Sequence, residues 1–546
     1  MPELFQDAID ESPVPAVAEG FTGMDAVTKA ARLPVGMVRK GANTWFDADG
    51  VLQTRPAFKF NTLLNTAPGA GPDYRVQGAG YYDIAGFERI LAVREGKLYE
   101  VQTAGNNAVN AHLAGPTPSA TADISFAQLI DRMLWTDGTL RFSYYAAGWS
   151  HGTVTTFSDA SAMPTWSKVA THRKRALALD PATDKIYASA VGQASAAADW
   201  VKTENIIVGD GNGDPTAALI SSQAGNLIVL KEASAHWVDA TAASVANWTS
   251  GKITGLTGCV AGKTGVAIGQ DVYFLSRYGV VSLGLLQATD SISALSPLSA
   301  PVQPYIDRIN WAAISTAWAT AWGDLYVLAL PVDSGTQPTL LLCYNTKLRQ
   351  WATPWQCTLP DQNLGGSSTA TFSGWTAPVI SRFAAKQETL LGDTCGRLVR
   401  LDLSAEKDES AAATSQEIVS WGTLRAFDFE SPDHMKQPFW LAVEFFQSTA
   451  SSVQINLVRD GLKAYPDKAL VDCEIIVTGL RTNNLNSFPI VFPLIFQANE
   501  AYKKNFHIRE HARFQEAGLQ FVSTAGRLRL RTVRMQAFID TPLLNT

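Results

Sequence analysis

The stretch GQDVYFLSRYGVVSLG, from Gly269 to Gly284, points most directly to the fold. Its apolar residues fall in two short runs, which an Arg-Tyr-Gly interruption separates. Short runs rich in Val, Phe and Leu on either side of a tight turn are typical of a β-hairpin. Similar segments recur along the chain, so we expect this hairpin to be one member of a repeat.

Seven segments share a Gly or Asp turn followed by a strand that begins with Leu, Ile or Val. They are EGKLYEV, DGTLRFS, TDKIYAS, AGNLIVL, GQDVYFL, WGDLYVL and CGRLVRL, with first apolar residues Leu98, Leu140, Ile186, Leu227, Val272, Leu325 and Leu398. These positions are separated by 42, 46, 41, 45, 53 and 73 residues. Most of the intervals are close to the ~40–50 residues of one four-stranded propeller blade. The sequence therefore predicts an all-β fold with a six- or seven-bladed β-propeller, and another large β-sandwich or barrel is the alternative.

The longest interval contains two further segments. Thr339–Trp355 (TLLLCYNTKLRQWATPW) is expected to supply additional strands, and Asn363–Gly374 (NLGGSSTATFSG) reads as an exposed loop because it is rich in Gly, Ser and Thr.

Composition indicates an ordered protein without a strongly basic surface. Of the 546 residues, 46% are hydrophobic and 17% are charged, and the 44 basic and 50 acidic residues give a net charge of −6. Before residue 415 the chain has 30 basic and 37 acidic residues, so the acidity lies in the first three quarters. This balance argues against a surface that holds nucleic acid phosphates by charge alone.

The cysteines and the N-terminal residues indicate folding in a cytosol. The five cysteines are far apart and form no C-x-x-C pair, so we expect buried free thiols rather than disulfides or a zinc site. The opening MPELFQDAIDESPVP lacks the basic-then-apolar order of a signal peptide, and no apolar run approaches the ~18 residues of a membrane span.

A change of composition after Leu403 divides the chain. Ser404–Gln416 is small, polar and poor in strand formers, whereas strand-like segments such as PFWLAVEFF and SVQINLVRDG follow it. We expect an N-terminal arm with the first strands in residues 1–60, the propeller in 61–403 and a linker or exposed loop in 404–416. A C-terminal β-sandwich-like domain is expected in 417–546.

Two motifs resemble catalytic sites but lack the required context. Gly148–Gly152 (GWSHG) matches the G-x-S-x-G nucleophile turn, yet β-branched and turn residues follow Ser150 where a helix is needed. His507–His511 (HIREH) matches the zinc pattern H-x-x-E-H, which needs His507 and His511 one helical turn apart, but its surroundings are strand-like. Neither is expected to be an active site.

Three further patterns suggest binding only weakly. GCVAGKT fails as a phosphate loop because three residues rather than four separate Gly258 from Gly262. DGNGDP (Asp210–Pro215) begins like a calcium loop but has Pro215 where a glycine is needed, so a turn between blades is expected. Arg527, Arg529 and Arg531 alternate on one strand face, which could contact nucleic acid, although an exposed face or a charge contact between subunits is more common.

The order of four segments resembles the β-propeller tail proteins of short-tailed bacteriophages, the tail nozzle or tail-stabilisation proteins. Asn43–Phe58 is similar to the early asparagine, glycine and "RPG" stretch of that family, with Ala57 in place of its glycine. Gly213–Val238 resembles a blade with a lysine turn, Val272–Leu283 its "FLs-x-x-Gv" hairpin, and Cys343–Trp355 its "Yn…W" blade end. The likeness covers residues 35 to 400.

The resemblance implies a virion component that forms an oligomeric ring, favoured as a hexamer, through which DNA leaves. It implies adaptor and fibre proteins of the tail as partners, transient contact with passing DNA, and assembly in the host cytoplasm. Such proteins bring no catalytic residues, so no enzyme, cofactor, metal or small-molecule substrate is expected. The rival interpretation is a propeller adhesin or depolymerase that binds host surface glycan.

Overall fold

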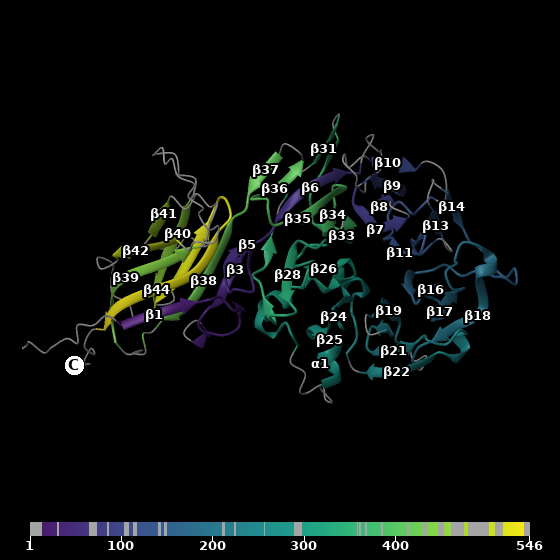
Figure 1. Ribbon diagram of the computed structural model, residues 1–546, viewed down its shortest axis with the longest axis horizontal. Coiled ribbons are helices and arrows are strands. Elements are labelled where there is room, and N and C mark those ends of the chain that lie inside the picture. The colour runs from purple at the N-terminus through teal and green to yellow at the C-terminus, as the bar shows by residue number, and fades with distance from the viewer. Residues whose placement is uncertain are drawn as a thin grey trace, which may run out of the picture.

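The protein consists of two β-rich bodies joined side by side, as its computed structural model shows (Figure 1). One body is a ring of small sheets, and the other is a pair of larger sheets. The structure describes residues 14–29, 32–64, 74–84, 87–102, 109–112, 117–139, 143–146, 150–209, 213–222, 225–255, 257–288, 297–356, 359, 362–365, 368–383, 386–411, 414–427, 429, 434–445, 452–459, 474–478, 502–507 and 517–539.

The ring is a seven-bladed propeller within the described residues. Each blade is a small antiparallel sheet whose strands follow one another from the innermost outwards. Blades 1 to 4 are β7 (Val76–Ile84), β8 (Phe87–Arg94), β9 (Lys97–Gln102), β10 (Val109–His112); β11 (Ser125–Leu129), β12 (Arg132–Thr136), β13 (Ser143–Ala146), β14 (Ser150–Thr153); β15 (Lys168–His172), β16 (Arg175–Asp180), β17 (Lys185–Ser189), β18 (Trp200–Ile207); and β19 (Thr216–Ser221), β20 (Leu227–Lys231), β21 (Ala235–Asp239), β22 (Thr249–Thr254). Blades 5 to 7 are β23 (Val266–Ile268), β24 (Asp271–Ser276), β25 (Gly279–Ser282); β26 (Trp318–Trp322), β27 (Leu325–Leu330), β28 (Leu340–Asn345), β29 (Gln350–Trp351), with β30 (Trp355–Gln356) also on β28; and β33 (Trp375–Phe383), β34 (Lys386–Asp393), β35 (Arg397–Asp402), β6 (Ala57–Leu63).

The innermost strands form a closed ring. Each packs beside the innermost strand of the next blade, from β7 through β11, β15, β19, β23 and β26 to β33, and β33 lies against β7. The expected propeller is confirmed, and the choice between six and seven blades resolves to seven.

An N-terminal strand closes the propeller. β6 pairs antiparallel with β35 as the outermost strand of blade 7, with Phe58 opposite Leu401 and Phe60 opposite Val399. The propeller therefore begins at residue 57 and takes its last strand from residues that the sequence assigned to an N-terminal arm. Pairing between strands about 340 residues apart leaves no local pattern in the sequence.

The seven turn motifs correspond to one segment in each blade, but not at the same place. Three of them supply the third strand, as in β9, β17 and β35, and three the second, as in β20, β24 and β27. The seventh, DGTLRFS, runs into the third strand β13 at Ser143, but its Leu140 lies outside the described residues. The second and third strands are the central strands, which are buried on both faces; all six residues of β27 are buried. Central strands such as β27 therefore read as apolar runs, whereas an outer strand such as β18 is exposed or half-buried after its first residue and is harder to recognise.

The turn glycines adopt the conformation that the turns require. Gly96, Gly138, Gly225, Gly323 and Gly396 all have φ between +58° and +91°. In this region an L-residue with a Cβ is strained, which explains why glycine precedes each of these strands.

Replacing Gly96 by Ala should destabilise the protein more than replacing Gly138. A Cβ on Gly96 would lie 2.7 Å from the backbone oxygen of Pro118, whereas no atom lies within 4 Å of a Cβ on Gly138. We expect Gly138→Ala to cost about 1 kcal/mol from its positive φ alone, and Gly96→Ala to cost about 1–3 kcal/mol more from the clash. Thermal and urea unfolding of both variants would measure this difference, and equal losses would contradict it.

Short helices and two hairpins complete the propeller. The helices are α1 (Leu283–Ala288), α2 (Gln303–Ile306) and 3₁₀ helices at Ala197–Asp199, Val245–Asn247, Gly262–Thr264, Ala300–Val302 and Trp311–Thr316. The segment read as an exposed loop instead contributes to a hairpin of β31 (Gln362–Gly365) and β32 (Ser368–Ala370), in which Asn363 lies opposite Thr369. The segment read as a linker contains a second hairpin, β36 (Lys407–Ala411) and β37 (Thr414–Glu417), which packs against β6.

The second body is a β-sandwich of two six-stranded sheets. One sheet has the order β4-β5-β44-β39-β42 with β1 also on β44, and the other has the order β2-β3-β38-β43-β40-β41. Their bounds are β1 (Val14–Glu19), β2 (Gly23–Met24), β3 (Met37–Ala42), β4 (Thr44–Phe46), β5 (Leu52–Thr54), β38 (Ser420–Phe427), β39 (Lys436–Phe445), β40 (Ser452–Arg459), β41 (Glu474–Thr478), β42 (Tyr502–His507), β43 (Ala517–Ser523) and β44 (Arg529–Ile539). Val38 and Phe521 from one sheet and Leu441 and Met535 from the other share one core.

The sandwich is not confined to the C-terminal residues. Five of its strands lie between Val14 and Thr54, and β1 pairs with β44 along its whole length, from Val14 opposite Ala537 to Glu19 opposite Thr532. The expected boundaries of residues 1–60 and 417–546 were therefore wrong, because the N-terminal strands fill positions in both sheets of the second body.

Candidate functional site

A buried ion pair lies where the sandwich meets the propeller. Arg55 lies in the short connection between β5 of the sandwich and β6 of the propeller. Its guanidinium makes two parallel contacts with the carboxylate of Asp408 in β36. The Nη1–Oδ1 and Nη2–Oδ2 distances are 2.8 and 2.5 Å, and both side chains are at most 2% exposed. Two-point contacts of this kind fix both position and orientation.

Other groups complete the surroundings of this pair. The backbone N–H of Phe58 donates to Oδ1 of Asp408 at 2.9 Å, and the Arg55 guanidinium lies 4.3 Å from the centre of the Phe58 ring. Arg55 Nε donates to Oδ1 of Asn43 at 3.0 Å. Hydrogen bonds of this kind offset the cost of removing two charges from water.

Asn43 connects the two bodies through its backbone and its side chain. Its N–H donates to the carbonyl of Pro354 and its Nδ2 to the carbonyl of Val419, while Oδ1 accepts from the N–H of Gln356. Its φ is +60°, a conformation that asparagine tolerates better than most residues. Asparagine at this position therefore both adopts the positive φ and supplies the side-chain hydrogen bonds between the two bodies.

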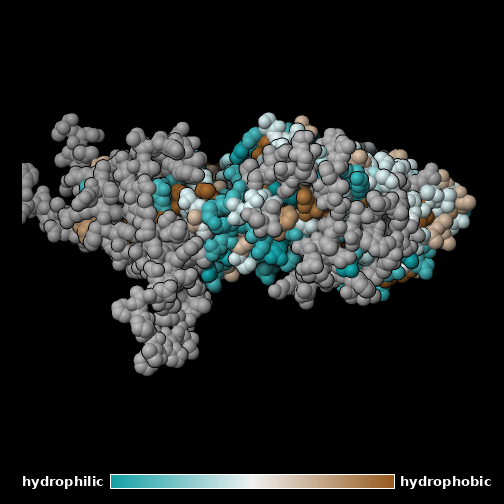
Figure 2. Space-filling model, turned by 90° about the horizontal axis from the view of Figure 1, so that it is seen from above, coloured by the Kyte–Doolittle hydropathy of each residue, from teal (hydrophilic) through white to brown (hydrophobic). Residues whose placement is uncertain are grey.

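A pair of threonines and a tryptophan extend the contact. The hydroxyls of Thr44 and Thr353 lie 2.9 Å apart, and the indole Nε1 of Trp355 donates to the carbonyl of Thr44 at 3.2 Å. We call the set Asn43, Thr44, Arg55, Thr353, Trp355, Gln356 and Asp408 the junction. Figure 2 shows that the described surface near the junction is mostly hydrophilic on the face seen from above.

The junction brings together two of the segments that carry the family resemblance. Asn43–Phe58 supplies Asn43, Thr44 and Arg55, and Cys343–Trp355 supplies Thr353 and Trp355. The other two segments, Gly213–Val238 and Val272–Leu283, lie in the neighbouring blades 4 and 5. Asp408 was missed because one of three acids in the polar segment Ser404–Gln416 carries no sign of burial.

A second group of charges lies at the propeller axis. Lys263 Nζ donates to Oδ2 of Asp123, and Arg75 Nη1 lies 2.7 Å from Oδ1 of the same carboxylate. Asp123 precedes β11 of blade 2 and Lys263 precedes β23 of blade 5, so the contact joins blades that are three apart in a ring of seven. Such blades face each other only across the axis, so these side chains cross the propeller's central channel at one end.

We call Arg75, Asp123, Lys168 and Lys263 the axial cluster. Burial and neighbouring charges shift the pKa values of Asp123 and Lys168. Burial acts to raise the pKa of Asp123, but Lys263 and Arg75 outweigh it and hold the pKa below its usual value. Burial lowers the pKa of Lys168, which begins β15 and donates to the carbonyl of Ala217. No local sequence signal indicates these contacts, since their residues come from five different blades.

The structure rules out the local geometry that the serine motif needs, and of the histidine motif it describes only His507. Ser150 begins β14, the outermost strand of blade 2, and lies opposite Ala146 in the ladder, so no helix follows it. His507 ends β42, a strand paired with β39, where His507 is opposite Trp440. Glu510 and His511 lie outside the described residues.

The phosphate-loop and calcium-loop resemblances have structural explanations. A Cβ on Gly262 would lie 1.8 Å from the backbone oxygen of Ala217, so this glycine permits close packing of blades 4 and 5. Asp214 lies in the expected turn between blades 3 and 4, where its carboxylate accepts from the N–H of Ala233 and the hydroxyl of Ser234. Asp210 lies outside the described residues.

The arginine row makes contacts within the chain. Arg527 Nη2 donates to Gln53 Oε1 at 2.8 Å, Arg529 lies 3.9 Å from Asp47, and Arg531 lies 3.2 Å from Glu444. Two of the three arginines therefore lie beside acidic side chains of the same chain.

Thiols, metal ligands and helices give few further candidates. Cys259 and Cys343 are free and buried as expected, and Cys395 is also buried. Burial raises the pKa of Cys259 to about 11, and Cys357 and Cys473 lie outside the described residues. The described part of the chain holds no group of three His, Cys, Asp or Glu side chains placed to bind a metal ion. None of its helices combines the length and apolar character needed to span a bilayer.

Comparison with known proteins finds similar propeller structures but no related family. No family model matches the chain, and no curated protein matches it. Among solved structures, the chain is similar to "YCF48 bound to D1 peptide", with 11% identity over 64% of this chain and 99% of that one, at a TM-score of 0.36. It is also similar to the "WD40 beta propeller domain of Doa1", with 6% identity over 63% of this chain and 97% of that one, also at 0.36.

Proposed function

We propose that this protein is a noncatalytic component of a phage tail, a nozzle subunit that forms a homo-oligomeric ring around the path of DNA ejection. The observation that carries the proposal is the junction. Two segments on which the resemblance rests lie about 300 residues apart in sequence, yet they meet in one buried contact between propeller and sandwich. Residues from two segments that carry the resemblance thus take part in one contact between the two bodies.

The axial cluster supports a ring rather than a single chain as the conduit. Because Asp123 and Lys263 meet across the propeller axis, duplex DNA has no path through one propeller. A passage would have to form between copies, and closed rings of identical subunits are the common way to build one. A hexamer is the ring size we favour.

Charge supports the same proposal. The excess of acidic over basic residues before residue 415 suits a duct wall that repels the phosphate backbone, because a basic wall would hold DNA through counterion release. Adaptor and fibre proteins of the tail would be its partners, the virion tail its location and the host cytoplasm its place of assembly.

The purified protein is expected to form rings that do not hold DNA. Native mass measurement should give about six times the mass of one chain, and duplex DNA should bind more weakly than about 1 μM near 0.15 M salt. Negative-stain images of the same sample would show the ring directly. A monomer at every concentration, or micromolar binding at that salt, would contradict the proposal. Release of sugar from host polysaccharide by the pure protein would favour the depolymerase instead.

A further inference from the structure

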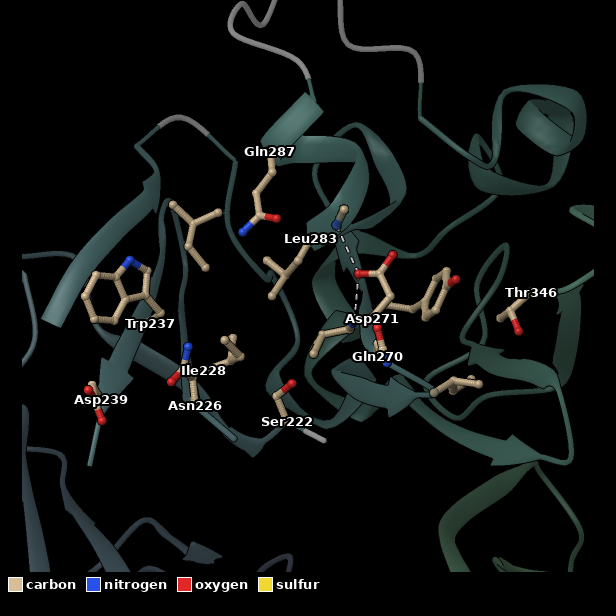
Figure 3. A pocket seen from close by; sticks show the side chains of 15 residues that line it. Ser222, Asn226, Ile228, Trp237, Asp239, Gln270, Asp271, Leu283, Gln287 and Thr346 are labelled. Atoms are coloured by element: carbon tan, nitrogen blue, oxygen red, sulfur yellow. Dashed lines mark hydrogen bonds between the residues drawn. The ribbon is translucent and has the colours of Figure 1, made fainter. Parts of the chain in front are cut away.

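An open cavity lies between blades 4 and 5, away from both the junction and the axial cluster. Its volume is about 790 Å³, within the roughly 300–1,000 Å³ of typical ligand sites. Blade 4 contributes Asn226 and Trp237, blade 5 contributes Gln270 and Asp271, and α1 contributes Gln287. Figure 3 shows Trp237 on one side, Asp271 on the other, and Gln287 reaching over from α1.

Three side-chain amides of this cavity are uncommitted. Asn226, Gln270 and Gln287 make no side-chain hydrogen bond to any described residue, and neither does the indole Nε1 of Trp237. Each amide offers both donors and an acceptor. The cavity therefore presents several neutral hydrogen-bonding groups that converge from different elements.

Trp237 is held as a fixed aromatic wall. It lies opposite Gly251 of β22 in the ladder, where a Cβ would come within 2.5 Å of the indole ring. The absence of a side chain lets the ring lie against the backbone of β22, which occupies one face of the indole. The rest of the ring lines the cavity beside Ile228 and Ile253.

The charges around the cavity disfavour an anionic ligand. No Lys, Arg or His lines it, whereas Asp239 and Asp271 do. Asp271 already accepts from the backbone N–H groups of Val272 and Gly284 at 2.8 and 3.0 Å, and Asp239 accepts from that of Thr241 at 2.9 Å. The acids therefore help to shape the wall and would repel phosphate or sulfate.

We propose that this cavity binds a neutral saccharide unit of a glycan chain. Hydroxyl groups both donate and accept, as the three amides do, and the apolar face of a sugar ring can pack against a fixed indole. A peptide fits less well, because extended peptides pair with free backbone groups and the adjoining strands β20 and β21 are paired with each other. The inference does not rest on the proposed function.

Saturation-transfer NMR with maltohexaose, cellohexaose, mannohexaose and chitohexaose tests this site in the full chain. At least one of these glycans should bind with a Kd of about 1 mM or tighter, while a heparin hexasaccharide should not. Trp237→Ala should weaken binding by about 10- to 100-fold and Gln287→Ala by roughly tenfold, because each removes a side-chain contact with the ligand. Gln287 is exposed on α1, so its variant remains informative if Trp237→Ala folds poorly.

Matched variants outside the cavity serve as controls. Trp311 is 40% exposed and Asn247 is exposed on a 3₁₀ helix, and neither lines the cavity. Trp311→Ala and Asn247→Ala should leave binding unchanged. Failure of all four glycans, preference for heparin or an unstructured peptide, or equal effects of cavity and control variants would overturn the inference. A ring that binds no glycan would count against this site alone, whereas a monomer that binds one would count against the tail proposal alone.

Discussion

A chain that lacks residues 1–63 is expected to lose both folded bodies. The deletion removes β1–β5, which occupy positions in both sheets of the sandwich, and β6, which closes blade 7. It would expose the edge of β35 and open the sandwich core around Val38 and Phe46. Because unpaired edges and half-covered cores aggregate, little soluble folded protein should remain.

Size-exclusion chromatography and circular dichroism of the soluble fraction would measure this loss. A chain that lacks only residues 1–12 retains every described strand and should behave like the full chain. A soluble propeller with a cooperative melt in the longer deletion would show that blade 7 holds without its fourth strand.

Asp408→Ala is expected to destabilise the protein by about 3–5 kcal/mol. The substitution leaves the buried guanidinium of Arg55 without its carboxylate and the N–H of Phe58 without its acceptor, and breaking a buried pair in this way is costly. Denaturant unfolding, followed by tryptophan fluorescence, would measure the change in the free energy of unfolding.

The preceding residue supplies a matched control. Lys407 pairs with Glu417 on the same hairpin, but the two side chains are 48% and 36% exposed, so Lys407→Ala should cost less than about 1 kcal/mol. Replacing both members of the buried pair, as in Arg55→Leu with Asp408→Leu, should recover part of the loss because no charge remains buried alone. If Asp408→Ala and Lys407→Ala had equal effects, the ion pair would not be what stabilises the junction.

The propeller was predictable from sequence because its central strands carry a local signal. Runs such as LYVLAL in β27, buried on both faces and preceded by Gly323, give the same signal in every blade. The closure by β6 and the mixed origin of the sandwich were not predictable, because strands such as β1 and β44 are paired by long-range contacts that no local pattern records.

The site was predictable only in part, for a related reason. The segment Asn43–Phe58 stood out by its resemblance, but its partner Asp408 sits among small polar residues that elsewhere indicate solvent exposure. Likewise, no sequence pattern indicates that Asp123 and Lys263 are in contact, because they are 140 residues apart in the chain. The motifs around Ser150 and His507 show the opposite failure. Their sequences match catalytic patterns, but both residues lie in β-strands.

The pairing of β1 with β44 has a consequence for how the protein is made. Ribosomes add about 5–20 residues per second, so roughly half a minute to two minutes pass between synthesis of β1 and release of its partner. During that time β1 and β5 have emerged while β44, with which both pair, has not. The sandwich therefore cannot finish folding until synthesis ends, whereas the propeller can close once β35 has emerged to pair with β6. We expect a late, slow maturation of the sandwich in which chaperones protect the waiting N-terminal strands.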